Sequence, residues 1–262
     1  MSPLERLEVE MDGPVARVWL ARPEARNAFD GRMVRELSDA MLGLGAREDV
    51  RVIVLGGRGK VFSAGADLAW MRSMADFSRE ENLVEARSLA ELFRVIDESP
   101  KPVVARVQGA ALGGGTGLVA AADISVATDT ARFGFSEVRL GLVPAVISPY
   151  VCARIGVTAA RELFLTGERF GARRAREMRL VSHVVGEADL DEAVAGRVAE
   201  LLAAGPCAIS AAKSLIRAVA HEPPAQVEEE AIERIAEIRT TPEAQEGMRA
   251  FLEKRKPKWQ ES

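Results

Sequence analysis

The order of apolar and glycine-rich segments in this chain of 262 residues predicts an α/β fold. Two short apolar runs, at residues 51–55 and 103–107, have the composition of buried strands. A glycine-rich loop follows each run, and each loop leads into a segment with helical periodicity. From about residue 147 onward the pattern is mostly helical. We therefore expect strands alternating with helices over roughly the first 185 residues, and helices after them.

The N-terminal segment predicts a β-hairpin followed by an amphipathic helix. Residues 6–11 and 15–20 form the two strands, and Asp12-Gly13-Pro14 forms the turn between them. Asp30 is placed to cap a helix ending near residue 46, whose apolar face holds Met33, Val34, Leu37, Met41 and Leu44. Further along, the pattern predicts a helix over about 79–98 and strands near 124–128 and 132–135.

The C-terminal part predicts three helices that each begin near a proline. Pro206 suits the first turn of a helix to about residue 219, Pro223-Pro224 precede one to about residue 239, and Pro242 begins the last. Their apolar stripe must pack on a surface, and we expect both the chain's own body and a neighbouring subunit to supply it. We accordingly divide the chain into a core, residues 1–188, and a helical region, residues 189–262.

Composition argues against several classes of function. The 39 acidic and 35 basic residues give a net charge of -4, so there is no global basic field for binding nucleic acid. Two cysteines and two histidines, without a ligand spacing, predict neither a disulfide framework nor a metal site. The N-terminus has no apolar core of signal-peptide type, and no apolar run reaches membrane-spanning length, so we expect a cytoplasmic protein.

The glycine-rich loops fail the tests for nucleotide binding but suit a different task. The loop at 56–60 lacks the first glycine and the final Ser or Thr of a phosphate loop, and neither it nor Gly113-Gly114-Gly115 completes the dinucleotide fingerprint. Each loop instead precedes a helix, whose first turn has unpaired N–H donors. Two such N–H groups that converge on one oxygen form an oxyanion hole. Tight turns and close packing are the structural alternative for any single glycine.

Four segments in register resemble the enoyl-CoA hydratase/isomerase (crotonase) superfamily. They are residues 61–68 (VFSAGADL), residues 102–115 (PVVARVQGAALGGG), Phe135-Ser136-Glu137 followed by residues 140–144 (LGLVP), and residues 246–255 (EGMRAFLEKR). The resemblance covers nearly the whole chain. It implies a spiral of ββα units with a C-terminal helical trimerisation region, assembled as a homotrimer or as a hexamer made of two trimers. It also implies an acyl-CoA thioester substrate, no metal and no separate cofactor, since coenzyme A is part of the substrate.

The resemblance assigns site residues by motif position. The backbone N–H groups of Ala66 and Gly114 would form the oxyanion hole. Coenzyme A would lie along the strip Ala64, Gly65, Ala66, Asp67 and Leu68, and beside the loop with Arg26 and Ala28. Phe251 and Lys254 would reach the adenine end in an adjoining subunit. Trp70, Gly117 and Pro144 would line the acyl pocket. From the residues alone, Asp67 is expected to cap the helix that begins near Leu68.

The carboxylates distinguish this chain from ordinary hydratases of the superfamily. Such hydratases use two glutamates, and here the first position is Gly117 while the second, Glu137, is present. The apolar neighbourhood of Glu137 predicts a raised pKa, as a proton shuttle requires. The stretch over residues 135–150 looks like the bacterial methylglutaconyl-CoA and isohexenylglutaconyl-CoA hydratase branch, in which glycine also occurs at the first position.

The leading hypothesis is reversible syn hydration of a branched 2-enoyl-CoA, carboxylated or not, of the 3-methylglutaconyl-CoA type, with Glu137 as the single glutamate. A lone glutamate beside an oxyanion hole also suits a 3,2-enoyl-CoA isomerase, which is the first alternative. A non-catalytic scaffold that binds acyl-CoA is the second. The motifs leave these alternatives open, because the superfamily's fold supports several reactions.

Overall fold

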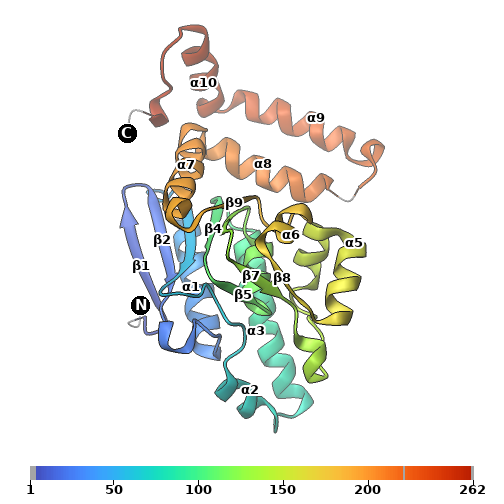
Figure 1. Ribbon diagram of the computed structural model, residues 1–262. Coiled ribbons are helices and arrows are strands. Elements are labelled where there is room, and N and C mark those ends of the chain that lie inside the picture. Colours follow the sequence, from blue (N-terminus) through green and yellow to red (C-terminus); the bar gives the residue numbers. More distant parts are fainter. Residues whose placement is uncertain (1–3, 221, 261–262) are drawn as a thin grey trace.

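The computed structural model describes residues 4–220 and 222–260 and confirms the predicted α/β class (Figure 1). Six strands form the main sheet in the order β1-β2-β3-β4-β6-β9, and three form a small sheet in the order β5-β7-β8. The strands are β1 (Leu7–Asp12), β2 (Val15–Leu20), β3 (Val52–Gly57), β4 (Val103–Val107), β5 (Ala110–Leu112), β6 (Ile124–Thr128), β7 (Arg132–Gly134), β8 (Arg169–Gly171) and β9 (His183–Val185). In the main sheet, β1 and β2 pair antiparallel and every later pairing is parallel.

Helices connect these strands and then continue to the C-terminal end of the described chain. The α-helices are α1 (Gly31–Ala46), α2 (Leu68–Met74), α3 (Arg79–Asp97), α4 (Gly114–Ala121), α5 (Ser148–Thr166), α6 (Ala172–Glu177), α7 (Leu190–Ala203), α8 (Pro206–Val219), α9 (Pro224–Thr240) and α10 (Pro242–Leu252). Short 3-10 helices are η1 (Pro23–Ala25), η2 (Glu137–Leu140), η3 (Glu187–Asp189) and η4 (Lys258–Gln260). No single described helix is long and apolar enough to cross a membrane, although the bent pair 187–203 and 206–219 passes that test together.

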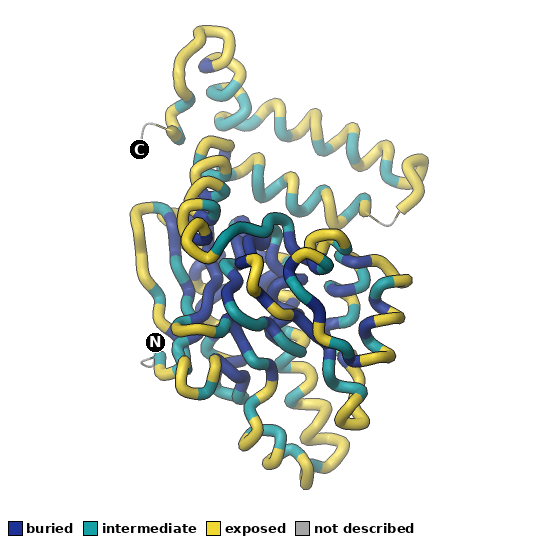
Figure 2. Tube along the Cα trace, viewed as in Figure 1, coloured by how far each residue is buried: buried dark blue, intermediate teal, exposed yellow. Residues whose placement is uncertain are grey.

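Packing covers both faces of the main sheet, and its central strands β3 and β4 are accordingly mostly apolar and buried (Figure 2). Ile53 and Leu55 of β3 point into the larger core, where α1, α3, α4 and α5 pack. Val52 and Val54 alternate onto the other face, against Val194 and other apolar residues of α7. The glycine-rich loops therefore leave the carboxyl ends of well-anchored strands.

Most predicted elements are confirmed, and the misses are the shortest strands. The hairpin, the Asp30-capped helix α1 and the strand β4 lie where the pattern predicts them, and the Asp30 carboxylate accepts from Met33 N at 2.7 Å. No strand was predicted at β5, β8 or β9, whereas β7, which is equally short, was predicted near 132–135. Three residues are too few for a reliable alternating pattern, and each of these strands pairs with a strand distant in the chain.

The last three helices stack beyond α7 at the end of the molecule farthest from α2 (Figure 1). Lys213 on α8 forms an ion pair of 2.7 Å with Asp123, and the Arg51 guanidinium donates to the carbonyl oxygens of Ala204 and Trp259. No described residue of α8 or α9 is buried, whereas α7 packs on the sheet. The proposed division at residue 188 thus places α7 with the helical region although its apolar face belongs to the core.

Candidate active site

Two backbone bridges bring the two glycine-containing loops together. Ser63 pairs with Ala111, because Ser63 N donates to Ala110 O and Leu112 N donates to Ser63 O, each at 3.0 Å. On the other side, Phe29 N donates to Gly65 O at 2.7 Å and Asp67 N donates to Phe29 O at 2.8 Å. The loop over residues 63–67 is therefore fixed between the end of β5 and the segment before α1.

This arrangement leaves the N–H groups of Ala66 and Gly114 without acceptors. The bridge to Phe29 uses the backbone groups of Gly65 and Asp67, so the Ala66 N–H points away from it. Gly114 is the first residue of α4, whose first turn has unpaired donors. Within residues 4–220 and 222–260, no group accepts a hydrogen bond from either N–H. Both residues line the same cavity, so the two donors are available to one negatively charged oxygen.

The glycines in these loops are needed mainly for close packing. A Cβ on Gly114 would lie 2.7 Å from Phe29 Cε2, and one on Gly115 would lie 2.8 Å from Ser63 Cβ. Gly65 has a φ of +90°, and a Cβ there would lie 2.9 Å from Leu112 O. Any side chain at these positions would push the two loops apart, and the two donors would separate with them.

Glu137 lies beside the start of α4 because β7 carries it there. Gly113 N donates to Gly134 O at 2.9 Å, and Glu137 follows three residues after that strand end. A Cβ on Gly113 would lie 3.1 Å from Glu137 Oε1, so the carboxyl group sits against the glycine that precedes the Gly114 donor. The Oε2 atom is buried and has no hydrogen-bond partner in the described chain. Burial raises the pKa of this carboxyl above its ordinary value, which favours the protonated form.

A cavity of about 790 Å³ contains these groups. Its walls come from the two loops, from α2 and α3, and from η2 with the segment that follows it. Eight residues that the motifs assigned to the site are among its lining: Ala64, Gly65, Ala66, Leu68, Trp70, Gly114, Glu137 and Pro144. Most of the wall is apolar, which suits an acyl chain, and water-poor surroundings strengthen the electrostatic effect of the donors.

Six assigned residues lie outside this lining. Arg26 is exposed, and its carbonyl accepts from Ala64 N at 2.9 Å. Ala28 is buried, and its carbonyl accepts from Arg22 Nη1 at 2.9 Å. Phe251 and Lys254 lie in and just after α10, at the end of the molecule opposite α2 (Figure 1). Phe251 is 83% exposed.

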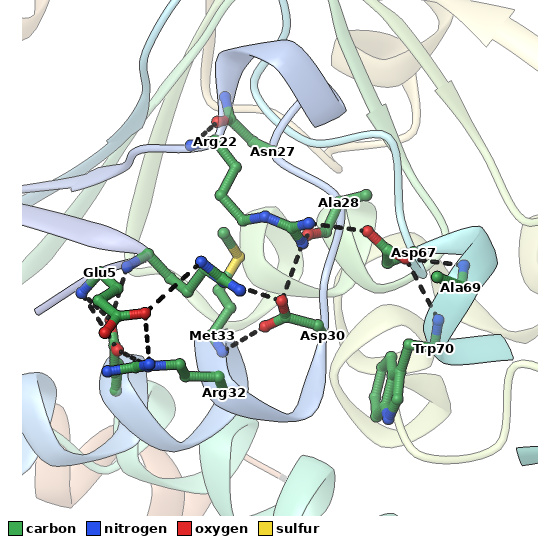
Figure 3. Close-up of polar contacts among 12 residues, drawn as sticks. Glu5, Arg22, Asn27, Ala28, Asp30, Arg32, Met33, Asp67, Ala69 and Trp70 are labelled. Atoms are coloured by element: carbon green, nitrogen blue, oxygen red, sulfur yellow. Dashed lines mark hydrogen bonds and ion pairs between the residues drawn. The ribbon is translucent and has the colours of Figure 1, made fainter. Parts of the chain in front are cut away.

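Asp67, the fifth of them, uses its carboxylate to bind other groups of the same chain. One carboxylate oxygen accepts from Ala69 N at 2.8 Å and from Trp70 N at 3.2 Å, so the predicted cap of α2 is confirmed. The other oxygen pairs with Arg22 Nη2 at 3.0 Å, and Arg22 also pairs with Asp30 at 3.1 Å (Figure 3). This network joins the start of α2 to the start of α1. Both carboxylate oxygens of Asp67 are therefore engaged within the chain, and the residue braces the start of α2.

Gly117 is also absent from the lining, because Ile147 covers it. A Cβ on Gly117 would overlap Ile147 Cγ2 and lie 2.9 Å from Phe93 Cε1. The acyl pocket assignment of Gly117 is therefore corrected, and Ile147, which does line the cavity, occupies that part of the wall. The glutamate that ordinary hydratases place here would have no room.

Sequence reasoning missed the α3 wall. Four residues of α3 line the cavity, namely Asn82, Glu85, Ala86 and Leu89, at the spacing of one helical face. That spacing was present in the sequence, but nothing in the pattern said that this face borders a cavity. Glu85 adds a second carboxyl group to the lining, which in the described chain contains no Lys, Arg or His.

Comparisons with known proteins agree with this geometry. The family model described as enoyl-CoA hydratase/isomerase matches residues 10–262. A Thermus thermophilus protein provisionally named an enoyl-CoA hydratase is 38% identical over 94% of this chain and 98% of its own length. Carnitinyl-CoA dehydratase of Salmonella typhi is 31% identical over 97% of this chain and 98% of its own length.

The solved structures extend this agreement to the fold. The crystal structure of an enoyl-CoA hydratase from Shewanella pealeana superposes with a TM-score of 0.95 at 41% identity, covering 98% of this chain and 96% of that one. Together with the family match, this shows that the chain belongs to the enoyl-CoA hydratase/isomerase family, the crotonase superfamily, and has its fold.

Proposed function

We propose that this chain reversibly hydrates a branched 2-enoyl thioester of coenzyme A, of the 3-methylglutaconyl-CoA type. One observation carries the proposal. The unpaired N–H groups of Ala66 and Gly114 face the same cavity as the Glu137 carboxyl, which also has an unpaired oxygen. The family membership and the named relatives support a hydratase in general terms.

The two donors would stabilise the charge that develops during hydration. When water adds to Cβ of the 2-enoyl thioester, electrons move onto the thioester oxygen and form an enolate. Two backbone N–H groups held by rigid loops favour this oxyanion over the neutral carbonyl, because they are already oriented. One such donor is typically worth about 3 kcal/mol of barrier.

Glu137 would complete the addition by moving a proton. Its raised pKa keeps it protonated more readily than an exposed glutamate, so it can donate to Cα on the face where water adds. In the dehydration direction the carboxylate removes the same proton. The step balances, because the attacking water becomes the hydroxyl at Cβ and releases its other proton, which by way of solvent replaces the proton that Glu137 delivers to Cα.

The methylglutaconyl-type substrate is supported by the likeness of residues 135–150 to that branch of hydratases and by the missing glutamate at Gly117. The cavity of about 790 Å³ has space for a branched acyl group beside the thioester. A carboxylate on the substrate, or Glu137 alone, would orient the attacking water. We include coenzyme A only as part of the substrate.

A 3,2-enoyl-CoA isomerase is the second candidate, and the single carboxyl group beside the oxyanion donors favours it. That reaction needs one residue to remove the α-proton and return it at Cγ, and no water has to be placed. A scaffold that only binds acyl-CoA is the third candidate. An unpaired, buried carboxyl oxygen is costly to keep, so its presence in the cavity favours catalysis over binding alone.

We also propose a homotrimer or a hexamer made of two trimers. In it, Arg26 would contact the nucleotide part of coenzyme A bound to its own subunit, and Phe251 and Lys254 would reach the adenine end in an adjoining subunit. Exposed apolar side chains on α8, α9 and α10 support a subunit interface there. They are Ile216, Ile232, Ile235, Met248, Phe251 and Leu252.

The substrate test uses 3-methylglutaconyl-CoA and 3-methylcrotonyl-CoA, which differ by one carboxylate, together with a 3-enoyl-CoA. We expect mass spectrometry in heavy water to show gain of one water on the branched 2-enoyl substrates. The carboxylated member should have a kcat/KM on the order of tenfold higher, about 1.4 kcal/mol. Double-bond migration with deuterium uptake and no added water would establish the isomerase instead. Tight binding without turnover of any substrate would favour a scaffold that only binds acyl-CoA.

Replacement of Glu137 by Gln should lower kcat by about 10² to 10⁴ without unfolding the protein. Burial raises the folded-state pKa, so the Glu137 contribution to stability is present at acid pH, below the ordinary value of 4.5, and is lost as the pH rises through the raised pKa. The melting temperature of E137Q at pH 7 should therefore equal or exceed that of the unchanged protein. Glu228→Gln, on the exposed face of α9, is the matched control, and undiminished turnover by E137Q would refute the assignment.

Introduction of a glutamate at Gly117 should destabilise the fold rather than improve hydration. The new side chain would displace Ile147 and Phe93, and overpacking of this kind costs about 1–3 kcal/mol. Urea unfolding should show this loss, and adding Ile147→Ala in the same chain should recover part of it. A G117E variant as stable as the parent and faster in hydration would show that the cavity accepts the usual pair of glutamates.

Phe251→Asp should weaken assembly, because it places a charge on the exposed apolar face of α10. Light scattering after size exclusion should give three or six chain masses for the parent and a smaller mass for the variant. Leu42→Asp, at an exposed apolar residue of α1, serves as the control. A monomeric parent protein would contradict the proposed assembly.

A further inference from the structure

Hydration requires a group that orients the attacking water and accepts its proton, in addition to the group that protonates Cα. The first helix after the second glycine loop has no room to supply it, because Ile147 and Phe93 fill the space beside Gly117. Among the described residues, the cavity lining contains two side chains with carboxyl groups, Glu137 and Glu85. Glu85 is therefore the candidate for the second task, and its surroundings decide whether it can perform it.

Glu85 lies on the face of α3 that also closes the space at Gly117. Glu85, Leu89 and Phe93 follow one another at intervals of four residues, so they form one row along the helix. Phe93 Cε1 would lie 2.9 Å from a Cβ on Gly117. Leu89 and Glu85, on the two preceding turns, line the cavity. The helix thus fills the usual place of a glutamate with Phe93 and presents a glutamate of its own to the cavity about 12 Å away along its axis.

The Glu85 carboxyl group lies near the chain segment that fixes the Ala66 donor. A Cβ built on Gly31 would lie 3.8 Å from Glu85 Oε2, so this oxygen reaches the start of α1. Gly31 follows Phe29 by two residues, and Phe29 also lines the cavity. The backbone of Phe29 is hydrogen-bonded to the donor loop on both sides of Ala66. The carboxyl group therefore borders the cavity on the side where the Ala66 loop is attached.

No other group of the described chain binds the Glu85 carboxylate. Within residues 4–220 and 222–260 it forms no hydrogen bond and no ion pair, whereas Glu81 and Glu91 on the same helix each have a partner. Glu85 is only partly buried, and solvation stabilises the charged form of a carboxylate, which is the form that accepts a proton. Burial raises the pKa of Glu137 and favours its protonated form. Two carboxyl groups in unequal surroundings suit the separate roles of base and acid.

We propose that Glu85 is the second catalytic carboxyl group of the hydration, and that it orients the attacking water and accepts its proton. This inference rests on the proposed hydratase function and supplies the base that the reaction needs. The water oxygen bonds to Cβ while its proton passes to Glu85, and the electrons of the double bond move onto the thioester oxygen. Glu137 donates its proton to Cα, and the enolate electrons form that bond. Proton exchange with solvent returns Glu85 to the carboxylate and Glu137 to the acid, so atoms and charges balance.

The test separates the addition of water from the transfer of the α-proton. Exchange of the α-protons of isovaleryl-CoA in heavy water needs the oxyanion donors and Glu137, but no water is added. Glu85→Gln should therefore lower kcat for hydration of 3-methylcrotonyl-CoA and of 3-methylglutaconyl-CoA about a hundredfold and change the exchange rate less than about twofold. Glu85→Asp, which keeps a carboxyl group, should retain part of the hydration. Glu80→Gln, at an exposed carboxyl group of the same helix, is the matched control and should change neither rate.

Glu137→Gln, by contrast, should lower both hydration and exchange. Undiminished hydration of either substrate by E85Q would overturn the proposal, and for 3-methylglutaconyl-CoA alone it would show that the substrate's own carboxylate orients the water. Equal losses of hydration and exchange in E85Q would assign Glu85 a structural role and also overturn it. If the parent protein hydrates neither substrate, the proposed function fails and the role of Glu85 with it. Hydration by the parent that E85Q retains would reject only the role of Glu85.

Discussion

The bridge between Ser63 and Ala111 is the contact on which the site depends. It is short, with two hydrogen bonds of 3.0 Å, yet it fixes the loop after β3 against β5 and the start of α4. The second bridge, from Phe29 to the same loop, leaves only the Ala66 N–H directed elsewhere. Two donors from segments about 50 residues apart in the chain thus face one cavity. Folding fixes the orientation of both donors, so no further reorganisation is needed when a substrate binds.

Close packing explains why small residues crowd these loops. Gly114 and Gly115 touch Phe29 and Ser63, and Gly113 touches the Glu137 carboxyl. The same constraint works against the usual chemistry at Gly117, where Ile147 and Phe93 fill the space of a side chain. A change at Gly117 alone would therefore meet a filled wall. The absence of the second glutamate is a property of the cavity's shape, and not only of one residue in the sequence.

The sequence was sufficient for the features that have a local signature. Asp30 and Asp67 cap helices because each side-chain oxygen accepts a hydrogen bond from an unpaired backbone N–H two or three residues further along the chain. The strand β4 could be predicted from its apolar run. The oxyanion donors were assigned from the family resemblance by motif position, and the pattern of a loop before a helix independently supports Gly114, the first residue of α4. The short strands β5, β8 and β9 could not be predicted, since their three residues form a ladder only with a partner distant in the chain. The cavity wall formed by α3 was not predicted for a related reason, because helical spacing identifies residues that share a face but does not identify the surface that this face borders.

The proposed proton transfer depends on the environment of Glu137. Its side chain is half-buried with one oxygen unpaired, and burial raises the pKa of the carboxyl, so the neutral form that must donate a proton to carbon is favoured. Glu85 lines the cavity from one face of α3, on a different element from the loops that carry the oxyanion donors. The cavity thus has one carboxyl with a buried, unpaired oxygen beside the start of α4 and a second carboxyl on its α3 wall.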